Sequence, residues 1–298
     1  MSSAAAASTE KTEFLTFGPV HLDVVDKDRS LTWWRDVVGL ELIAEDRKSA
    51  ELGVDGRTLI VLRETARRPV RAGYSGLYHL ALNLPDEAAF AQTLARLLTA
   101  HARVGTTDHV VAKSMYLADP DGIGLELTVE MPDRVKSIVW PSTATHPEII
   151  DAKGRRRQGL EPLDHEQVLA KLPGGALPRF LPTDTKVGHM HLKASDLESA
   201  YGFYRDQLGL LPNNYVPVIG YGDLGTGDYR IHRIALNTWQ GAGVPPRPEG
   251  MAGLHRFTVR FDSAERMHDA LDRLDGARQL EDGYLIWDRD GNGLALNV

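Results

Sequence analysis

The alternation of apolar and polar side chains changes its period several times between residues 76 and 129. Residues 76–84 (GLYHLALNL) alternate as a strand does, whereas Phe90, Leu94 and Leu97 follow at the spacing of one helix face. The pattern predicts, in order, a strand over 76–84, a helix over 86–102, and strands over 104–111, 114–117 and 124–129. This stretch is therefore expected to form one βαβββ unit.

The end of the chain repeats this order of elements. A strand is predicted over 253–261 and a helix over 264–274, followed by strands that end at residues 295–298. Both stretches carry the same turn, Asp-x-Asp-Gly, at 119–122 (DPDG) and 288–291 (DRDG). Asp-Gly is a strong hairpin signal because glycine tolerates positive φ.

Two further units are indicated by a direct repeat at an offset of 170 residues. Residues 18–24 (GPVHLDV) recur as residues 188–194 (GHMHLKA), and five later residues recur with them. These are Asp26, Arg35, Asp36, Gly39 and Leu40, which reappear as Asp196, Arg205, Asp206, Gly209 and Leu210. The chain is thus expected to be an α+β protein with four βαβββ units, over 14–65, 75–131, 186–240 and 252–298.

These units set the expected domain organisation. The expected parts are a disordered tail over 1–13, an N-terminal pair of units over 14–131, a linker over 132–185 and a C-terminal pair of units over 186–298. A loop as long as this linker is uncommon unless it wraps a domain or covers a site. A short helix is expected within it over 163–172, and its arginine run at 155–157 is interpreted as solvated surface.

Composition narrows the class of protein. A chain of 298 residues with 42% hydrophobic residues is long enough for two globular domains. The net charge of −7 leaves no basic surface for nucleic acid, and no apolar run approaches the roughly 18–20 residues of a membrane span. The lack of cysteine excludes disulfides, thiolate metal sites and cysteine nucleophiles. The first ten residues do not resemble a secretion signal, so a cytoplasmic protein is expected.

The four units act as controls for one another, because only some of them carry metal-binding side chains. Their first strands align at one position, which is occupied by Pro19, His79, His189 and Arg256. The last strands of units two and four align through the Asp-Gly turn, which matches Glu126 with Ala295. Units two and three thus offer two histidines and a carboxylate, whereas units one and four offer proline, arginine and alanine.

Two histidines and one carboxylate form the facial triad of non-heme Fe(II) oxygenases, which leaves coordination positions open. Glu126 lies between two leucines, where an unpaired carboxylate is costly to bury and a metal ion would pair it. We therefore predict a metal site of His79, Glu126 and His189. The ion is expected to be Fe(II) or Mn(II), because the same ligands accept either. His191 is the rival ligand, since it lies two residues beyond His189 on the same strand face.

Paired βαβββ units with inward-facing ligands resemble the vicinal oxygen chelate superfamily, which includes glyoxalase I, bleomycin-resistance proteins and extradiol dioxygenases. The stretch 232–246 (HRIALNTWQGAGVPP) is similar to the two-domain catechol 2,3-dioxygenase-like group, and the resemblance spans 14–131 and 186–298. It implies that the units pair into two barrel-like mixed sheets. It also implies an Fe(II)-dependent extradiol dioxygenase that takes a catechol-type aromatic and dioxygen, on a scaffold that is often a homodimer.

The predicted ligands come from units two and three, on opposite sides of the linker. In extradiol dioxygenases the ligand-bearing units usually belong to one half of the chain. We therefore expect units two and three to pack together around the metal, and units one and four to form a metal-free counterpart. A shared metal requires the His79 and His189 side chains to lie within about 8 Å, given metal–nitrogen bonds near 2 Å.

The resemblance also assigns residues around the metal. His232 matches the acid–base histidine of extradiol dioxygenases, a role that suits a side chain with a pKa near neutrality. Tyr116, ten residues before the carboxylate ligand, matches their active-site tyrosine. His109, which precedes the same strand as Tyr116, is the third residue expected to be catalytic and to line the pocket. Asn237 and Trp239 are expected to border the substrate. Lys113 and Arg233 are expected to add positive charge near the mouth, which would favour an anionic aromatic substrate.

Two other functions stay open. A glyoxalase-like isomerase or thiol transferase would keep the metal, but such enzymes commonly need a fourth ligand, a carboxylate on the last strand of the partner unit. Residues 229–239 of unit three contain no Asp or Glu, which argues against this reading. A non-catalytic small-molecule-binding protein of the same fold would lack the metal ligands.

Overall fold

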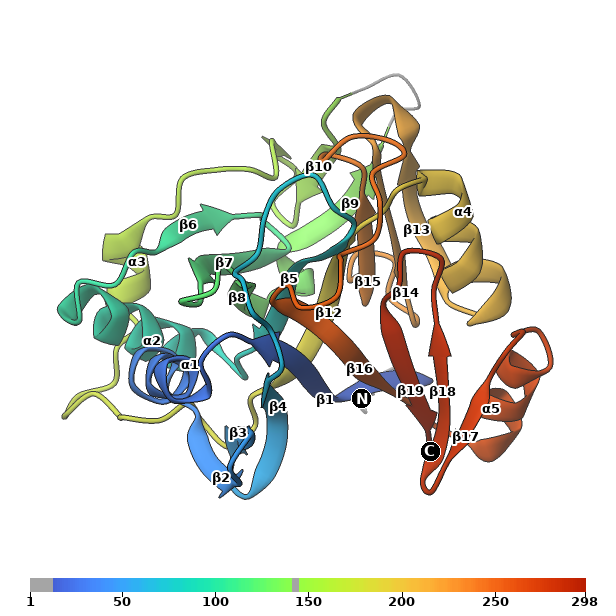
Figure 1. Ribbon diagram of the computed structural model, residues 1–298. Coiled ribbons are helices and arrows are strands. Elements are labelled where there is room, and N and C mark those ends of the chain that lie inside the picture. Colours follow the sequence, from blue (N-terminus) through green and yellow to red (C-terminus); the bar gives the residue numbers. More distant parts are fainter. Residues whose placement is uncertain (1–12, 141–144) are drawn as a thin grey trace, which may run out of the picture.

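The computed structural model describes residues 13–140 and 145–298. Within them the chain forms four βαβββ units, and the segment between units two and three has a small sheet of its own (Figure 1). The disordered tail expected over 1–13 lies outside the described residues, apart from Glu13. Among the described residues, no helix has the length and apolar character that crossing a membrane requires.

All four predicted units are present. The first consists of β1 (Leu15–Val24), α1 (Lys27–Trp33), β2 (Glu41–Glu45), β3 (Ser49–Val54) and β4 (Arg57–Glu64). The second consists of β5 (Gly76–Asn83), α2 (Glu87–Thr99), β6 (Gly105–Asp108), β7 (Ala112–Ala118) and β8 (Gly124–Glu130). The third consists of β12 (Lys186–Lys193), α4 (Leu197–Gly202), β13 (Leu211–Val216), β14 (Tyr221–Gly225) and β15 (Ile234–Asn237). The fourth consists of β16 (Gly253–Phe261), α5 (Ala264–Leu271), β17 (Arg278–Leu280), β18 (Gly283–Trp287) and β19 (Gly293–Asn297).

The units pair into two mixed sheets of eight strands, each drawn from both halves of the chain. One sheet has the order β17-β18-β19-β16-β1-β4-β3-β2 and is called here the 1/4 sheet. The other has the order β13-β14-β15-β12-β5-β8-β7-β6 and is called the 2/3 sheet. Antiparallel pairing of first strands joins the units, β1 with β16 and β5 with β12. The predicted α+β fold of two barrel-like mixed sheets is confirmed, and units two and three share a sheet as expected.

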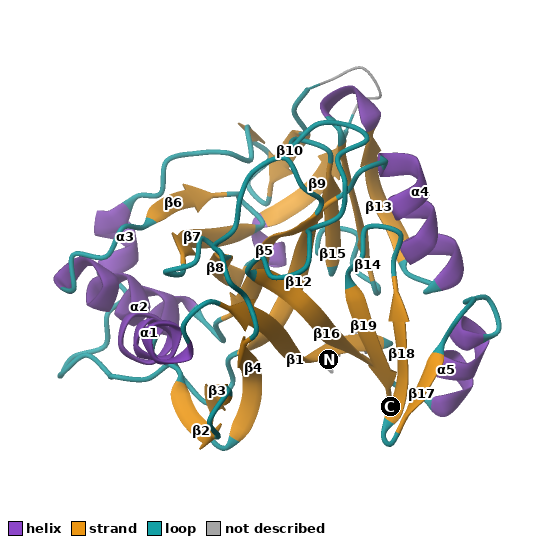
Figure 2. Cartoon of the chain, viewed as in Figure 1, coloured by secondary structure: helices purple, strands orange, loops and turns teal. Residues whose placement is uncertain are grey.

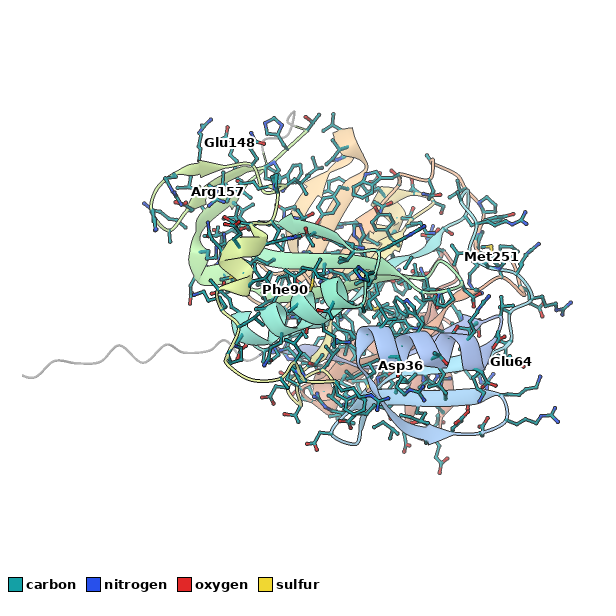
Figure 3. The ribbon with its side chains drawn as sticks, turned by 90° about the vertical axis from the view of Figure 1, so that its left-hand side faces the viewer. Asp36, Glu64, Phe90, Glu148, Arg157 and Met251 are labelled. Carbon is teal, nitrogen blue, oxygen red and sulfur yellow. The ribbon has the colours of Figure 1, made fainter. Side chains whose placement is uncertain are left out.

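Helices cover one face of each sheet and leave the other face available for polar side chains. The helix α1 packs on β3 and β4, α2 on β8, α4 on β14 and β15, and α5 on β16 and β19, so that helices lie at the periphery (Figure 2). Successive strand residues point to opposite faces, and Val20 and Leu22 of β1 are fully buried in the core. His21 between them therefore faces the side away from the helices. Phe90 of α2 is buried in the same core (Figure 3).

The two sheets are tied together by their Asp-x-Asp-Gly turns. In the turn between β7 and β8 of the 2/3 sheet, Asp121 Oδ2 accepts a hydrogen bond from the backbone N–H of Val25, directly after β1 (2.8 Å). In the turn between β18 and β19 of the 1/4 sheet, Asp290 Oδ1 accepts one from the backbone N–H of Ser195, just after β12 (2.9 Å). Each sheet thus holds a strand–helix junction that belongs to the other.

The segment between units two and three, expected to be a linker over 132–185, carries regular structure. It contains the three-stranded sheet of β9 (Val135–Val139), β10 (Glu148–Asp151) and β11 (Arg156–Arg157), and the helix α3 (His165–Leu169). The helix lies inside the stretch predicted to be helical, whereas no periodic pattern indicated the small sheet.

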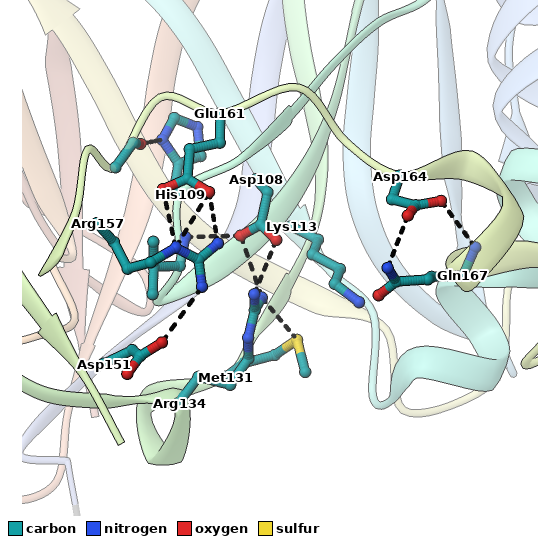
Figure 4. A network of polar contacts seen from close by, with 12 residues as sticks. Asp108, His109, Lys113, Met131, Arg134, Asp151, Arg157, Glu161, Asp164 and Gln167 are labelled. Carbon is teal, nitrogen blue, oxygen red and sulfur yellow. Dashed lines mark hydrogen bonds and ion pairs between the residues drawn. The ribbon is translucent and has the colours of Figure 1, made fainter. Parts of the chain in front are cut away.

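Ion pairs fix this segment to unit two and to itself (Figure 4). Arg134 Nη2 lies 2.8 Å from Asp108 Oδ2 beside β6, and Arg157 Nε donates to Glu161 Oε1 at 2.9 Å. Arg157 Nη1 also lies 3.5 Å from Asp151. The arginine run therefore balances carboxylates of its own segment and supplies little free positive charge.

Arg233 is buried and paired, which overturns its expected place at a charged mouth. Its Nη1 donates to Glu130 Oε1 at 2.6 Å, and its guanidinium also contacts Glu13. Only 5% of the Arg233 side chain is exposed. Burial would raise the pKa of Glu130, but the Arg233 charge outweighs burial and lowers it, so Glu130 is ionised.

Replacing Arg233 with alanine is expected to destabilise the fold strongly. The change leaves the Glu130 carboxylate, whose side chain is 22% exposed, without its cation, and breaking one side of a pair costs up to about 3–5 kcal/mol where the pair is buried. Urea unfolding at neutral pH would measure the free energy of unfolding. Arg266→Ala is the matched control, because Arg266 pairs with Asp262 at the surface, where a pair contributes about 1 kcal/mol or less. Equal losses in the two variants would contradict this account of Arg233.

Candidate metal centre

Three strands of the 2/3 sheet bring the predicted ligands together. Ala81 of β5 is paired both with Glu126 of β8 and with His189 of β12, and His79 lies two residues before it on the same face. His79 Nε2 lies 2.9 Å from Glu126 Oε2, and His189 Nε2 lies 3.1 Å from the same oxygen. The two imidazole nitrogens are 3.4 Å apart, well inside the predicted limit. All three side chains are buried.

The triangle of ligand atoms has the size that a divalent cation requires. Six-coordinate ions with ligands about 2.1 Å away place adjacent ligand atoms about 3.0 Å apart, and the three distances here are 2.9, 3.1 and 3.4 Å. Two imidazoles and one carboxylate also suit such an ion chemically. Among the described residues, no other group of three histidine or acidic side chains brings its ligand atoms within 4.8 Å of one another.

The electrostatics of the cluster favour a cation between these atoms. Burial lowers the pKa of His79, so this imidazole is neutral and keeps a lone pair for a metal. Burial would raise the pKa of Glu126, but His189 and His79 outweigh it and hold the pKa well below its usual value. One buried carboxylate thus faces two imidazoles, and the aligned positions of the 1/4 sheet carry Pro19, Arg256 and Ala295.

His191, the rival ligand, lies outside the cluster because another residue occupies its nitrogen. The backbone N–H of Trp239 donates to Asn237 Oδ1 at 3.1 Å, which fixes the orientation of the Asn237 amide. Asn237 Nδ2 then donates to His191 Nε2 at 2.9 Å, so this nitrogen is an acceptor and the proton lies on Nδ1. Asn237 is fully buried and does not line the cavity, which places it behind His191 and not at a substrate. Trp239 does line the cavity and is half exposed.

The three residues predicted to be catalytic surround the cluster. The ring of His232 lies 4.4 Å from that of His189, centroid to centroid, and burial lowers the pKa of His232. Tyr116 pairs with Glu126 across β7 and β8, and its Oη is 2.9 Å from His109 Nε2. His109 Nδ1 lies 2.9 Å from the carbonyl oxygen of Gly159, which only accepts. Nδ1 therefore carries the proton, and Nε2 accepts the hydroxyl proton of Tyr116.

A cavity of about 800 Å³ opens over these residues. Its wall is largely apolar and aromatic, with the middle segment of the chain along one side. The lining residues beyond those predicted include Tyr78, Trp140, Ile149, Leu160, Tyr221 and Asp223. Sequence reasoning missed these residues, although Asp223 could have been found because it occupies in unit three the strand position that Tyr116 occupies in unit two. Burial raises the pKa of Asp223 to about 6.

The two basic side chains expected near the mouth, Lys113 and Arg233, do not line this wall. Lys113 Nζ lies 2.7 Å from Glu87 on α2, and Arg233 is paired inside the protein, so neither lines the cavity. One arginine, Arg230, is among the lining residues, and it is paired with Asp228. The expected preference for an anionic substrate therefore has no support in the geometry.

Gly124 is expected to be required for the ligand geometry. A Cβ atom at this position would lie 2.3 Å from the carbonyl oxygen of Tyr78 and 3.1 Å from His79 Cβ, so alanine would push β8 away from β5. We expect Gly124→Ala to lower metal affinity about tenfold and to cost about 1–3 kcal/mol of stability, as overpacking typically does. Metal titration and urea unfolding would measure the two effects.

Gly293→Ala is the matched control for this change. Gly293 begins β19 in the 1/4 sheet, and a Cβ atom there would lie 2.8 Å from the carbonyl oxygen of His255. A similar loss of stability is expected, with unchanged metal affinity. Equal metal affinities in the two variants would show that Gly124 does not position the ligands.

Comparison with known proteins gives a consistent set of similarities. The sequence model of the Glyoxalase/Bleomycin resistance protein/Dioxygenase superfamily matches residues 16–127. A catechol-2,3-dioxygenase of Bacillus subtilis (strain 168) is 33% identical over 279 residues, which is 90% of this chain and 89% of that protein.

Solved structures share the fold at low sequence identity. Glyoxalase I from Zea mays has a TM-score of 0.54 at 16% identity, over 95% of this chain and 92% of that chain. A putative dioxygenase from Bacillus subtilis subsp. subtilis str. 168 has a TM-score of 0.55 at 14% identity, over 95% and 86% of the two chains. At these identities the likeness extends to the arrangement of the strands and helices.

Proposed function

This chain belongs to the glyoxalase/bleomycin resistance protein/dioxygenase superfamily, and we propose that it is an extradiol dioxygenase that opens the ring of a catechol beside its two hydroxyl groups. The observation that carries the proposal is the buried cluster of His79, Glu126 and His189 at the floor of an aromatic cavity. The relative named as a catechol-2,3-dioxygenase supports the same reaction class.

The ligand set favours oxygenase chemistry over the glyoxalase-like alternative. The position in unit three that corresponds to Glu126 is Ala235, which pairs with His191 as Glu126 pairs with Ala81. A fourth carboxylate ligand from the last strand of the partner unit is therefore absent, as the sequence predicted. Three protein ligands leave coordination positions open for a bidentate catechol and dioxygen. A non-catalytic binding protein would not need these three metal ligands.

The proposed cofactor is Fe(II), with Mn(II) as the alternative. A divalent ion at this site supplies the charge that favours loss of a catechol proton and a centre where catechol and dioxygen meet. His79, His189 and Glu126 would hold the ion, with Glu126 providing the single negative charge. Both ions can change oxidation state, which a reaction with dioxygen uses, and the same three ligands accept either ion.

The surrounding residues have separate roles in this proposal. His232, next to His189, takes the proton that the catechol hydroxyl loses and later returns it to the product. The hydroxyl of Tyr116 donates a hydrogen bond to His109 Nε2. The lone pairs of the Tyr116 oxygen are therefore free to accept a hydrogen bond from the second catechol hydroxyl. The aromatic walls at Tyr78 and Tyr221 hold the ring and exclude water.

The test is direct. The protein is loaded with Fe(II) without oxygen, mixed with catechol, and then exposed to air. We expect consumption of one dioxygen per catechol in an oxygen electrode and a yellow product from ring opening. Full metal content without oxygen uptake, over a panel of substituted catechols, would contradict the proposal. Absence of bound metal after loading would favour a non-catalytic binding protein.

A further inference from the structure

The face of the 1/4 sheet that corresponds to the metal-binding face carries a cluster of basic side chains. His21 of β1 pairs with Arg256 of β16, as His191 of β12 pairs with His79 of β5. Asp23, two residues along β1, pairs with Arg63 of β4. Arg256 thus stands at the position of the ligand His79, in a sheet with no metal ligands of its own at the aligned positions.

Two guanidinium groups in this cluster have hydrogen-bonding capacity that the described residues do not use. Arg256 Nε is buried from solvent and has no hydrogen-bond partner among the described residues. The contact of Arg256 Nη2 with His21 Nε2 is long, at 3.5 Å. Arg63 Nη1 is likewise buried without a hydrogen bond, 3.5 Å from Asp23 Oδ1. Unused buried donors are costly, and charged donors more so.

Asp23 and Glu51 are carboxylates of this face that contact other residues, and Asp23 Oδ1 also lies 3.5 Å from Arg63 Nη1. Asp23 accepts hydrogen bonds from Thr65 Oγ1 at 2.6 Å and from Arg247 Nη2 at 3.1 Å. Glu51 of β3 accepts one from the hydroxyl of Thr58 at 2.8 Å. Both acidic groups therefore have partners other than Arg256.

The balance of charge around Arg256 is positive. Burial lowers the pKa of Arg256, and the like charge of Arg63 lowers it further. Burial and the Arg256 charge also lower the pKa of His21 to about 3, so His21 is neutral at physiological pH. Arg63 thus shares the carboxylate of Asp23 with Arg247, and no carboxylate of the described residues contacts Arg256. An added anion would relieve the repulsion between the guanidinium groups.

We propose that this face of the 1/4 sheet binds a small oxyanion, a carboxylate or a phosphate, between Arg256 and Arg63. A guanidinium group presents two parallel N–H donors that match the oxygens of either anion. The site is separate from the metal centre and independent of the catalytic function. Duplication would thus have produced two ligand sites at one position of the fold, a cation site in the 2/3 sheet and an anion site in the 1/4 sheet.

Calorimetric titration of the metal-loaded full chain tests the proposal, with inorganic phosphate and malonate as separate probes at constant ionic strength. We expect saturable binding of one anion per chain. Arg256→Gln and Arg63→Gln, which remove the charge and keep much of the side-chain volume, are each expected to lower the affinity at least tenfold. Arg278→Gln, at an exposed position on β17 of the same sheet, is the matched control and is expected to leave the affinity unchanged.

Further comparisons separate this site from binding to the metal. Glu126→Gln is expected to bind the anion as the original chain does, since its change lies in the other sheet. A preference for phosphate or for malonate would identify the chemical source of the natural ligand. The proposal fails if neither probe saturates, if both arginine variants bind as tightly as the original, or if Glu126→Gln abolishes binding.

Discussion

The variant Glu126→Gln is expected to lose its metal ion and to cleave catechol at least about 10²-fold more slowly. Glutamine keeps the shape of the side chain and removes the one negative charge among the ligands. Removing one partner from a buried charge pair typically costs about 3–5 kcal/mol, and each 1.36 kcal/mol is tenfold in rate or affinity. The two imidazoles, 2.9 and 3.1 Å from the Glu126 oxygen, would then hold a cation without an anion beside them.

Elemental analysis after Fe(II) loading and desalting would measure the bound metal, and an oxygen electrode would give kcat/KM. Glu51→Gln is the matched control, because Glu51 is also a strand carboxylate but lies in the 1/4 sheet. It is expected to retain the full metal content. One metal ion per chain in Glu126→Gln would contradict the assignment of this carboxylate as a ligand.

The variant His232→Ala is expected to keep its metal and to lose catalytic rate. A positioned acid–base residue typically contributes about 10²–10⁴-fold, so we expect kcat to fall about 10³-fold while metal content is unchanged. The loss should be smaller for 4-nitrocatechol than for catechol, because the nitro group already makes the hydroxyl proton easy to lose. This difference between substrates separates proton transfer from a merely structural role.

Stopped-flow absorbance with both substrates would measure these rates. His268→Ala on the exposed side of α5 controls for loss of a histidine remote from the cavity. Rates of His232→Ala within about threefold of the original for both substrates would exclude a role in proton transfer. An equal loss for both substrates would instead indicate that His232 positions His189, with which it is in ring contact.

Much of the fold and the centre of the site could be predicted because the chain contains its own comparison. The contrast between His189 and Pro19, and between Glu126 and Ala295, separates residues that the fold needs from residues that chemistry needs. Strand periodicity then places the ligands on one sheet face, since alternate residues share a face. Pairing of units two and three followed from the positions of the ligands, and the observed strand order agrees.

The parts that sequence could not predict depend on contacts between distant residues. Arg233 was expected at the mouth because of its neighbours in sequence, but its direction is decided by Glu130, 103 residues away. Trp140 and Leu160 line the cavity because the middle segment folds back on β6, and no periodicity reports such packing. Asn237 was expected beside the substrate, whereas its amide is used to orient His191.

The exchange of Asp-x-Asp-Gly turns between the sheets has a consequence for the integrity of the chain. Since each sheet takes one unit from either half, a cut between Gly174 and Gly175 would produce two fragments that are each incomplete in both sheets. The fragments should therefore remain associated, and they should complement each other when co-expressed as a split protein. Neither half is therefore expected to fold alone, because each would lack half of the strands of both sheets.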